Sequence, residues 1–273
     1  MCCKSWLAAL LLVPALAVAS PKVLYVTHEP GRWHDYSAQL ASMQQLATQE
    51  GWSLTVATGD AAEAHAFLRT PEFARNHDAV VYNLCFAASR DLEAMTNLIA
   101  QTEILGVPAV LVHCAMHSWW GTFKAGQAIP GNTLGKARAD RKLLAEWQET
   151  GNTTPLPAWG DFSGVASTKH GRKKPIQLSA VAIHPITIDL PANYQTSKTE
   201  LYNNHYLTPD VQPLLIGKQG RDEAIVMWLA PRGAGQVLGL TLGHDQAEWE
   251  DPVFLKLLAN GINFLTGSAS TVK

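Results

Sequence analysis

The chain has 273 residues, of which 47% are hydrophobic and 16% are charged, and its formal net charge is −2. This composition suits one large globular domain. Lysine and arginine are scattered along the chain without forming a basic stripe, which argues against a nucleic-acid partner.

The first 20 residues are interpreted as a secretory signal peptide that lies outside the fold. Lys4 supplies a positive charge, residues 6–18 are apolar but too few to span a bilayer comfortably, and residues 17–19 are a small-x-small cleavage signal. An uncleaved membrane anchor is the alternative. We therefore expect an exported protein, periplasmic or secreted, without an integral membrane segment once the signal is removed. A single domain would cover residues 21–267, followed by a short tail over residues 268–273.

In the first half of the mature chain, predicted strands alternate with predicted helices. Apolar or alternating runs predict strands at residues 22–27, 52–58, 79–84 and 109–112. Apolar residues at helical spacing predict helices at residues 36–50, 61–67 and 90–105. Each crossover is long enough to hold a helix, so the strands are expected to form a parallel sheet in an α/β fold.

The second half is less regular. Residues 151–175 are rich in glycine, proline, threonine and lysine, and we expect a long irregular insertion there. The remaining predicted elements are a helix at 142–150, strands at 179–183 and 214–217, a hairpin of strands 224–229 and 236–242, and a closing helix at 252–265.

Polar side chains follow the first, third and fourth predicted strands. In open α/β sheets, ligands bind beyond the carboxyl ends of the strands, so this edge is the expected site. The residues concerned are His28, His34, Asp35, Asn83, Cys85, His113, Cys114 and His117.

Cys85 and Cys114 are the two cysteines left after signal removal, and each follows an apolar strand. They could pair in an exported protein, but we expect free buried thiols because neither lies in a loop that needs a crosslink. Cys114 also stands between a strand and a helix, which is the nucleophile-elbow position and would favour a thiolate. The alternative is a small residue that packs beneath the site.

Five histidines at strand ends or in adjoining loops form the candidate site, namely His28, His34, His113, His117 and His244. Histidine suits proton transfer near neutral pH, and three or more converging histidines suit a divalent metal such as zinc. His113 and His117 have the spacing of a helical zinc motif, but the glutamate of that motif is absent. The candidate metal ligands are His28, His113, His117 and His244. Among the other histidines, His65, His77 and His205 are expected at the surface, and His184 before Pro185 is expected to shape a turn.

Glu200 and Tyr202 alternate along a short extended segment, so their side chains are expected to face the same side. The carboxylate could act as an acid or base or hold sugar hydroxyls, or it could make a structural hydrogen bond. Trp33, Trp119 and Trp120 adjoin the polar motifs, where they could stack on sugar rings or close the edge of the core.

The motifs, taken in order, resemble those of the ThuA-like (trehalose utilisation) family, whose fold resembles the class I glutamine amidotransferases. The residues that carry the resemblance are His28 and His34-Asp35 after the first strand, His113-Cys-Ala-Met-His117, His184-Pro185, Glu200-Leu-Tyr202 and Gly243-His244-Asp245. It implies a flavodoxin-like, three-layer α/β/α fold and an association with disaccharide and ketosugar catabolism. His170 also resembles a family histidine.

The resemblance weakens the case for a thiol mechanism. Cys114 falls where the amidotransferases keep their nucleophile, but many ThuA-like sequences have a small residue there. The chain also lacks a convincing His-x-Glu pair of the amidotransferase type, so glutaminase activity is not expected.

The predicted function is an enzyme that acts on a small-molecule carbohydrate, a sugar or ketoglycoside, by hydrolysis, elimination or isomerisation, with or without a metal. His113 and His117 are the predicted acid/base pair, and Glu200 assists them. The residues predicted to bind substrate are His28, His34, Trp119, Tyr202 and His244. The alternatives are a non-catalytic carbohydrate-binding protein and an amidase-like hydrolase that depends on Cys114. The sequence lacks a Gly-x-Gly-x-x-Gly motif after the first strand, so a dinucleotide cofactor is not expected.

Overall fold

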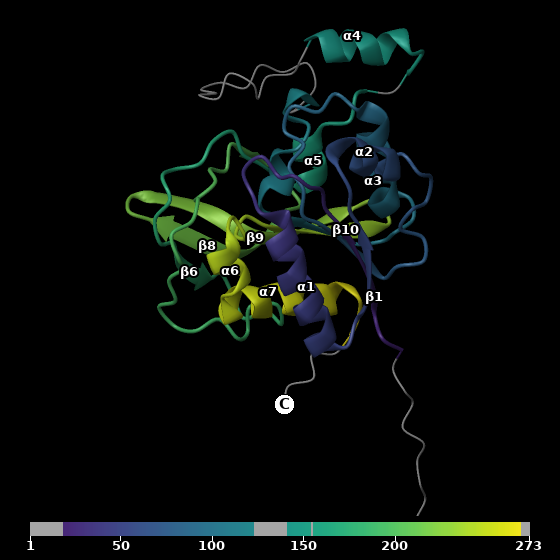
Figure 1. The fold of residues 1–273 in the computed structure, drawn as a ribbon. Coiled ribbons are helices and arrows are strands. Elements are labelled where there is room, and N and C mark those ends of the chain that lie inside the picture. Colours follow the sequence, from purple (N-terminus) through teal and green to yellow (C-terminus); the bar gives the residue numbers. More distant parts are fainter. Residues whose placement is uncertain (1–18, 123–140, 154, 269–273) are drawn as a thin grey trace, which may run out of the picture.

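The fold is built on one eight-stranded mixed sheet with helices on both faces (Figure 1). The computed structural model describes residues 19–122, 141–153 and 155–268. The interpretation of residues 1–18 as part of a signal peptide, and of residues 269–273 as part of a tail, lies outside these ranges. Within them, every helix is too short or too polar to cross a bilayer.

One half of the sheet is parallel, as the alternation of strands and helices predicts. Its strands lie in the order β2-β1-β3-β4. Their bounds are β1 (Lys22–Val26), β2 (Ser53–Ala57), β3 (Ala79–Tyr82) and β4 (Ala109–Val112). All carboxyl ends in this half therefore meet at one edge of the sheet, where the polar motifs follow.

The other half contains the antiparallel hairpin and its neighbours. β10 (Gly235–Leu240) pairs parallel with β4 and antiparallel with β9 (Asp222–Arg232). Beyond β9 lie β8 (Gln212–Gln219) and the edge strand β6 (Gln177–Ala180), both antiparallel to their neighbours. The parallel pairing of β10 with β4 brings the chain after β10 to the same edge as the chain after β4.

The helices make the outer two of three layers. α1 (Tyr36–Glu50), α6 (Gln246–Trp249) and α7 (Pro252–Leu265) lie on one side of the sheet in Figure 1. On the other side lie α2 (Ala61–Leu68), α3 (Leu92–Glu103) and α5 (Trp159–Ser163). Each face carries its own buried apolar cluster, and consecutive residues of β1, such as Leu24 and Tyr25, belong to different clusters.

α1 begins where the sequence gives a cap. The Asp35 carboxylate accepts a hydrogen bond from the Ala38 backbone N–H at 3.0 Å. The helix ends at Gly51, whose φ of 74° is the left-handed conformation that glycine adopts without penalty. The cap follows His34 directly, so the start of α1 fixes the position of that histidine.

Two expectations about the second half need correction. The predicted insertion at 151–175 is not wholly irregular, because it contains α5 and the short strand β5 (Val165–Ala166), which pairs with β7 (Tyr206–Leu207). The strand predicted at 179–183 instead ends at Ala180, and the chain turns away after it. The predicted helix at 142–150 is present as α4 (Arg141–Glu149).

Candidate functional site

A cavity of about 1060 Å³ opens at the carboxyl edge of the parallel strands. Its wall includes residues from the segments after β1, β3, β4 and β10, as expected for a ligand site in an open α/β sheet. Among the lining residues are His28, His34, Cys85, His117, Glu200 and His244. The chain therefore brings residues more than 200 positions apart into one pocket.

His113 lies at a sharp turn between β4 and the short 3₁₀ helix η1 (His113–His117). Its φ of 48° is a left-handed conformation that residues other than glycine seldom adopt, and such strain is concentrated at functional sites. The Nδ1 atom lies 2.6 Å from the Thr241 carbonyl oxygen, which can only accept, so Nδ1 carries the proton and donates it. The elbow residue is therefore His113, with a bare Nε2, and not Cys114.

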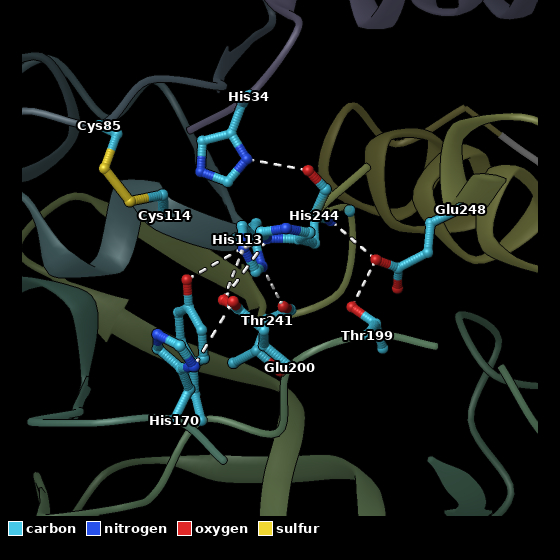
Figure 2. A network of polar contacts seen from close by, with 12 residues as sticks. His34, Cys85, His113, Cys114, His170, Thr199, Glu200, Thr241, His244 and Glu248 are labelled. Atoms are coloured by element: carbon cyan, nitrogen blue, oxygen red, sulfur yellow. Dashed lines mark hydrogen bonds and ion pairs between the residues drawn. A yellow bond between two sulfur atoms is a disulfide. The ribbon is translucent and has the colours of Figure 1, made fainter. Parts of the chain in front are cut away.

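Three polar groups surround the Nε2 atom of His113 (Figure 2). His244 Nδ1 and the Tyr202 hydroxyl each lie 3.0 Å away, and Glu200 Oε2 lies 3.7 Å away. Glu200 and Tyr202 thus reach the same atom, as their alternation along the chain predicts. Glu200 Oε2 is also 3.4 Å from His244 Nδ1, while its other oxygen is 3.5 Å from His170 Nδ1.

His34 completes the cluster from the first loop. Its Nδ1 donates to the His244 carbonyl oxygen at 2.8 Å, and its ring centroid lies 5.1 Å from that of His113 and 5.0 Å from that of His244. The Gln39 side-chain amide donates to the same carbonyl at 3.3 Å. Residues from α1 and from the first loop therefore hold the segment after β10 in place.

Glu248 holds the backbone of His244 in place through a hydrogen bond. One carboxylate oxygen accepts from the His244 backbone N–H at 2.7 Å and from the Thr199 hydroxyl at 2.6 Å (Figure 2). Burial raises the pKa of Glu248 to about 7. Sequence reasoning missed this residue, although a carboxylate four positions after His244, at the start of a helix, is a signal that could have revealed it.

Burial keeps the site histidines neutral at pH 7. It lowers the pKa of His28 to about 4 and that of His244 to about 3, and neighbouring histidines lower the pKa of His244 further. Burial also lowers the pKa of His34 and, more strongly, that of His113. Since a neutral imidazole has one bare nitrogen, each of these rings offers a lone pair.

His28 and His117 line the cavity but lie outside the cluster. The His28 ring stacks on Phe86 with centroids 4.7 Å apart, and its Nε2 accepts from the Cys85 N–H at 3.4 Å. The His117 ring stacks on Tyr202 with centroids 4.2 Å apart, and its buried Nε2 has no hydrogen-bond partner among the described residues. The predicted metal ligands His28 and His117 therefore do not belong to the cluster. The third histidine beside His113 and His244 is His34.

The tryptophans divide between pocket and core. Trp33, with 65% of its surface exposed, and the half-buried Trp120 line the cavity. Trp119 was predicted to bind substrate, and this is wrong. It is fully buried, donates from Nε1 to the Asp91 carbonyl at 3.0 Å, and packs against Trp159 with centroids 4.7 Å apart.

Cys85 and Cys114 form a disulfide, with Cα atoms 5.1 Å apart, so the expectation of free thiols is wrong. The two cysteines follow the neighbouring strands β3 and β4, whose pairing brings them together. A sulfur bonded to another sulfur cannot act as a thiolate nucleophile. The oxidised protein therefore has no Cys114-dependent mechanism.

The histidines expected outside the site lie mostly in partly buried positions. His184 accepts a hydrogen bond from the Ile186 N–H at 3.2 Å, which confirms its role in a turn. His65, His77 and His205, expected at the surface, are each half-buried. His65 lies behind the pocket wall, where its ring centroid is 4.1 Å from that of Phe86.

Three cationic residues that sequence reasoning did not single out, Arg32, Arg90 and Lys173, also line the pocket. Arg32 lies over the Trp33 ring, 4.7 Å from its centroid, and Lys173 lines the wall near Glu200. Lys173 belongs to the run Arg172-Lys173-Lys174, and nothing in that run distinguishes a pocket residue from a solvated one.

Comparisons with known proteins identify the family of the chain and agree with its fold. A family model for ThuA, described as trehalose utilisation, matches residues 22–265. A ThuA-like protein from Parabacteroides merdae superimposes with a TM-score of 0.64 at 14% identity, covering 93% of each chain. One from Bacteroides uniformis gives a TM-score of 0.60 at 16% identity, covering 93% of this chain and 95% of the other. A search of curated proteins found no match.

Proposed function

The chain belongs to the ThuA (trehalose utilisation) family, and we propose that it is an enzyme that acts on a sugar or ketosugar by proton transfer in the histidine-lined pocket. The observation that carries this proposal is the convergence of Glu200, Tyr202 and His244 on the Nε2 atom of His113, within hydrogen-bonding or ion-pairing distance. Polar groups that converge in a concave pocket are typical of small-molecule sites.

The pocket suits a carbohydrate in size and in lining. Its volume of about 1060 Å³ is slightly above the range of roughly 300–1,000 Å³ that is usual for small-molecule sites. Trp33, Phe86 and Trp120 supply flat apolar surface for the C–H faces of a sugar, while the histidines and Glu200 supply partners for hydroxyls.

We propose Glu200 and His117 as the groups that move the proton. The Glu200 carboxylate lies in the pocket beside the imidazoles of His113, His170 and His244. His117 presents a buried Nε2 that has no hydrogen-bond partner among the described residues. His113 was predicted to act directly with His117. Its Nε2 already faces Tyr202 and His244, so we assign it to holding the cluster in place. Hydrolysis, elimination and isomerisation all require one group that removes a proton and another that delivers one.

We also propose that the protein works outside the cytoplasm. The signal-like sequence of residues 1–20 supports this location. The Cys85–Cys114 disulfide supports it as well, because such bonds persist in oxidising compartments and are rare in the cytosol.

The proposal is tested by measuring turnover of a panel of disaccharides, glycosides and their keto derivatives. Glu200→Gln and His117→Gln are each expected to lower kcat on the active substrate at least about 100-fold, since each removes a proton-transfer group. His205→Gln is the matched control, because this half-buried histidine lies outside the residues that line the cavity. Its kcat should equal that of the wild type.

The same panel separates the enzyme from a non-catalytic binding protein. Calorimetry that detects sugar binding without turnover of any panel member would favour the binding protein. Absence of both binding and turnover across the panel would overturn the assignment to sugars.

A further inference from the structure

We propose that His34, His113 and His244 bind one divalent transition-metal ion of the zinc class, and that Glu200 supplies a carboxylate beside it. This inference goes beyond the sugar chemistry, because metal binding can be measured with no sugar present. It rests on the positions of the nitrogens, on the hydrogen bonds that orient the rings, and on the balance of donors and acceptors.

The ligand atoms of the three histidines are close enough to share an ion. One nitrogen from each ring lies within 4.8 Å of the others, and all three residues are buried. In a tetrahedral zinc site the nitrogens lie about 2.0–2.1 Å from the ion, which places neighbouring ligand atoms roughly 3.3 Å apart. His113 Nε2 and His244 Nδ1, which are 3.0 Å apart, already approach this separation.

Backbone carbonyls orient two of the three rings. His113 Nδ1 donates to the Thr241 oxygen and His34 Nδ1 donates to the His244 oxygen, at 2.6 and 2.8 Å. Both rings must therefore carry the proton on Nδ1 and keep Nε2 bare. A metal-bound histidine almost always donates its second nitrogen in this way, which fixes the tautomer and the ring plane.

The cluster holds more acceptors than donors. The acceptors are the bare nitrogens of His34 and His113 and the two oxygens of Glu200. The nearby donors are the Tyr202 hydroxyl, at most one N–H of His244 Nδ1, and His170 Nδ1, which is shared with the Gly171 carbonyl. A buried acceptor without a partner costs free energy. A divalent cation would satisfy the imidazole lone pairs together, and the Glu200 carboxylate would offset part of its charge.

The donor set selects the class of ion. Neutral imidazoles favour zinc and its first-row neighbours, whereas calcium and magnesium prefer oxygen ligands. Three histidines leave a coordination position open towards the cavity, which is the arrangement of catalytic zinc sites. An ion there would polarise a sugar carbonyl or activate a bound water.

The test uses the disulfide-bonded protein without its signal segment, stripped with a chelator and titrated with Zn²⁺ against a chromophoric chelator. We expect one equivalent of Zn²⁺, with a Kd raised at least about 100-fold by His34→Ala, His113→Ala or His244→Ala. His28→Ala is the matched control, since His28 also lines the cavity but lies outside the cluster. Its Zn²⁺ affinity should equal that of the wild type.

A spectroscopic measurement on the wild-type protein covers the case in which a variant fails to fold. Co²⁺ should give the visible spectrum of a nitrogen-ligated, four- or five-coordinate ion without a thiolate charge-transfer band. Such a band would place the ion on Cys85, Cys114 and His34, which also lie close together, and would overturn the proposal. Binding of less than a tenth of an equivalent, or an equal loss of affinity in His28→Ala, would overturn it as well.

Discussion

At the scale of single residues, Glu248 is the clearest example of a side chain that acts through another. Its oxygen accepts from the His244 N–H and the Thr199 hydroxyl, and all three residues are buried. Glu248→Ala would leave two buried donors without a partner, at a cost of about 1–3 kcal/mol each. We expect the free energy of unfolding to fall by at least about 2 kcal/mol in urea titrations, and the Zn²⁺ affinity to fall about 10-fold or more.

Two further variants separate positioning from a general loss of stability. Glu248→Gln keeps one oxygen that can accept both hydrogen bonds, so it should recover most of the Zn²⁺ affinity. Glu250→Ala removes an exposed carboxylate on the same helical segment and should change stability by less than about 0.5 kcal/mol. Wild-type Zn²⁺ affinity in Glu248→Ala would show that this contact does not position His244.

The sequence predicts which residues reach the pocket better than it predicts their partners there. Histidines after strands lie at the expected edge because parallel strands end together. His34, and not His28, is the third member of the cluster because of the path of the short loop that contains both residues. The periodicity of apolar residues in the sequence does not predict the path of such a loop. Likewise, Trp119 and Trp120 are adjacent, and packing against Trp159 decides which of them is buried.

At the scale of elements, the disulfide joins two strands that are already neighbours. Cys85 and Cys114 are separated by 29 positions, and closing a loop of this length restricts the unfolded chain by roughly 3–4 kcal/mol. We expect the double variant Cys85→Ala/Cys114→Ala to lose about that much stability. Thiol titration of the denatured, unreduced protein lacking residues 1–20 should find no free thiol, and detection of two would contradict the disulfide.

The packing of the β9–β10 hairpin leaves no room for a side chain at one glycine of β10. Gly239 lies opposite Trp228, and a Cβ atom built on it would lie 2.0 Å from the Trp228 ring. Gly239→Ala should therefore destabilise the fold by about 1–3 kcal/mol through overpacking, as measured by urea unfolding. In a double-mutant cycle, Trp228→Leu should remove most of this cost, and simple additivity of the two changes would refute the clash.

Elements were predictable from sequence where local pattern and tertiary structure agree. The strands and helices of the parallel half alternate with clear periodicity, and α1 has both an aspartate cap and a terminal glycine. α5 was missed because it has five residues and is held by distant contacts. One such contact is the hydrogen bond from Trp159 Nε1 to the Ala115 carbonyl at 2.9 Å.

At the scale of the whole molecule, the mixed sheet explains why the site needs both halves of the chain. The parallel strands supply His34 and His113 at their carboxyl edge, whereas His244 arrives only because β10 runs parallel to β4. A sequence pattern identifies the hairpin but does not show which of its strands pairs with the parallel half. The order of strands across the sheet is a tertiary property, and it decides which histidines meet.

Burying neutral histidines also makes the whole fold sensitive to acid, and His117 shows this best. Burial lowers its pKa to about 3, whereas a histidine in an unfolded chain has a pKa of about 6.5. Between these values the unfolded chain binds a proton that the folded chain excludes. The free energy of unfolding therefore falls as the pH drops below about 6.5, and His117 alone accounts for about 2 kcal/mol between pH 7 and pH 5.

His117→Phe tests this linkage while keeping an aromatic ring against Tyr202 and Trp120. Urea titrations at pH 7 and pH 5, with a chelator present so that metal release does not contribute, should show a pH-dependent loss about 2 kcal/mol smaller in the variant than in the wild type. His205→Gln, at a half-buried position away from the pocket, should leave most of the wild-type loss in place. Equal losses in His117→Phe and the wild type would mean that His117 takes up its proton in the folded state, which contradicts its burial as a neutral ring.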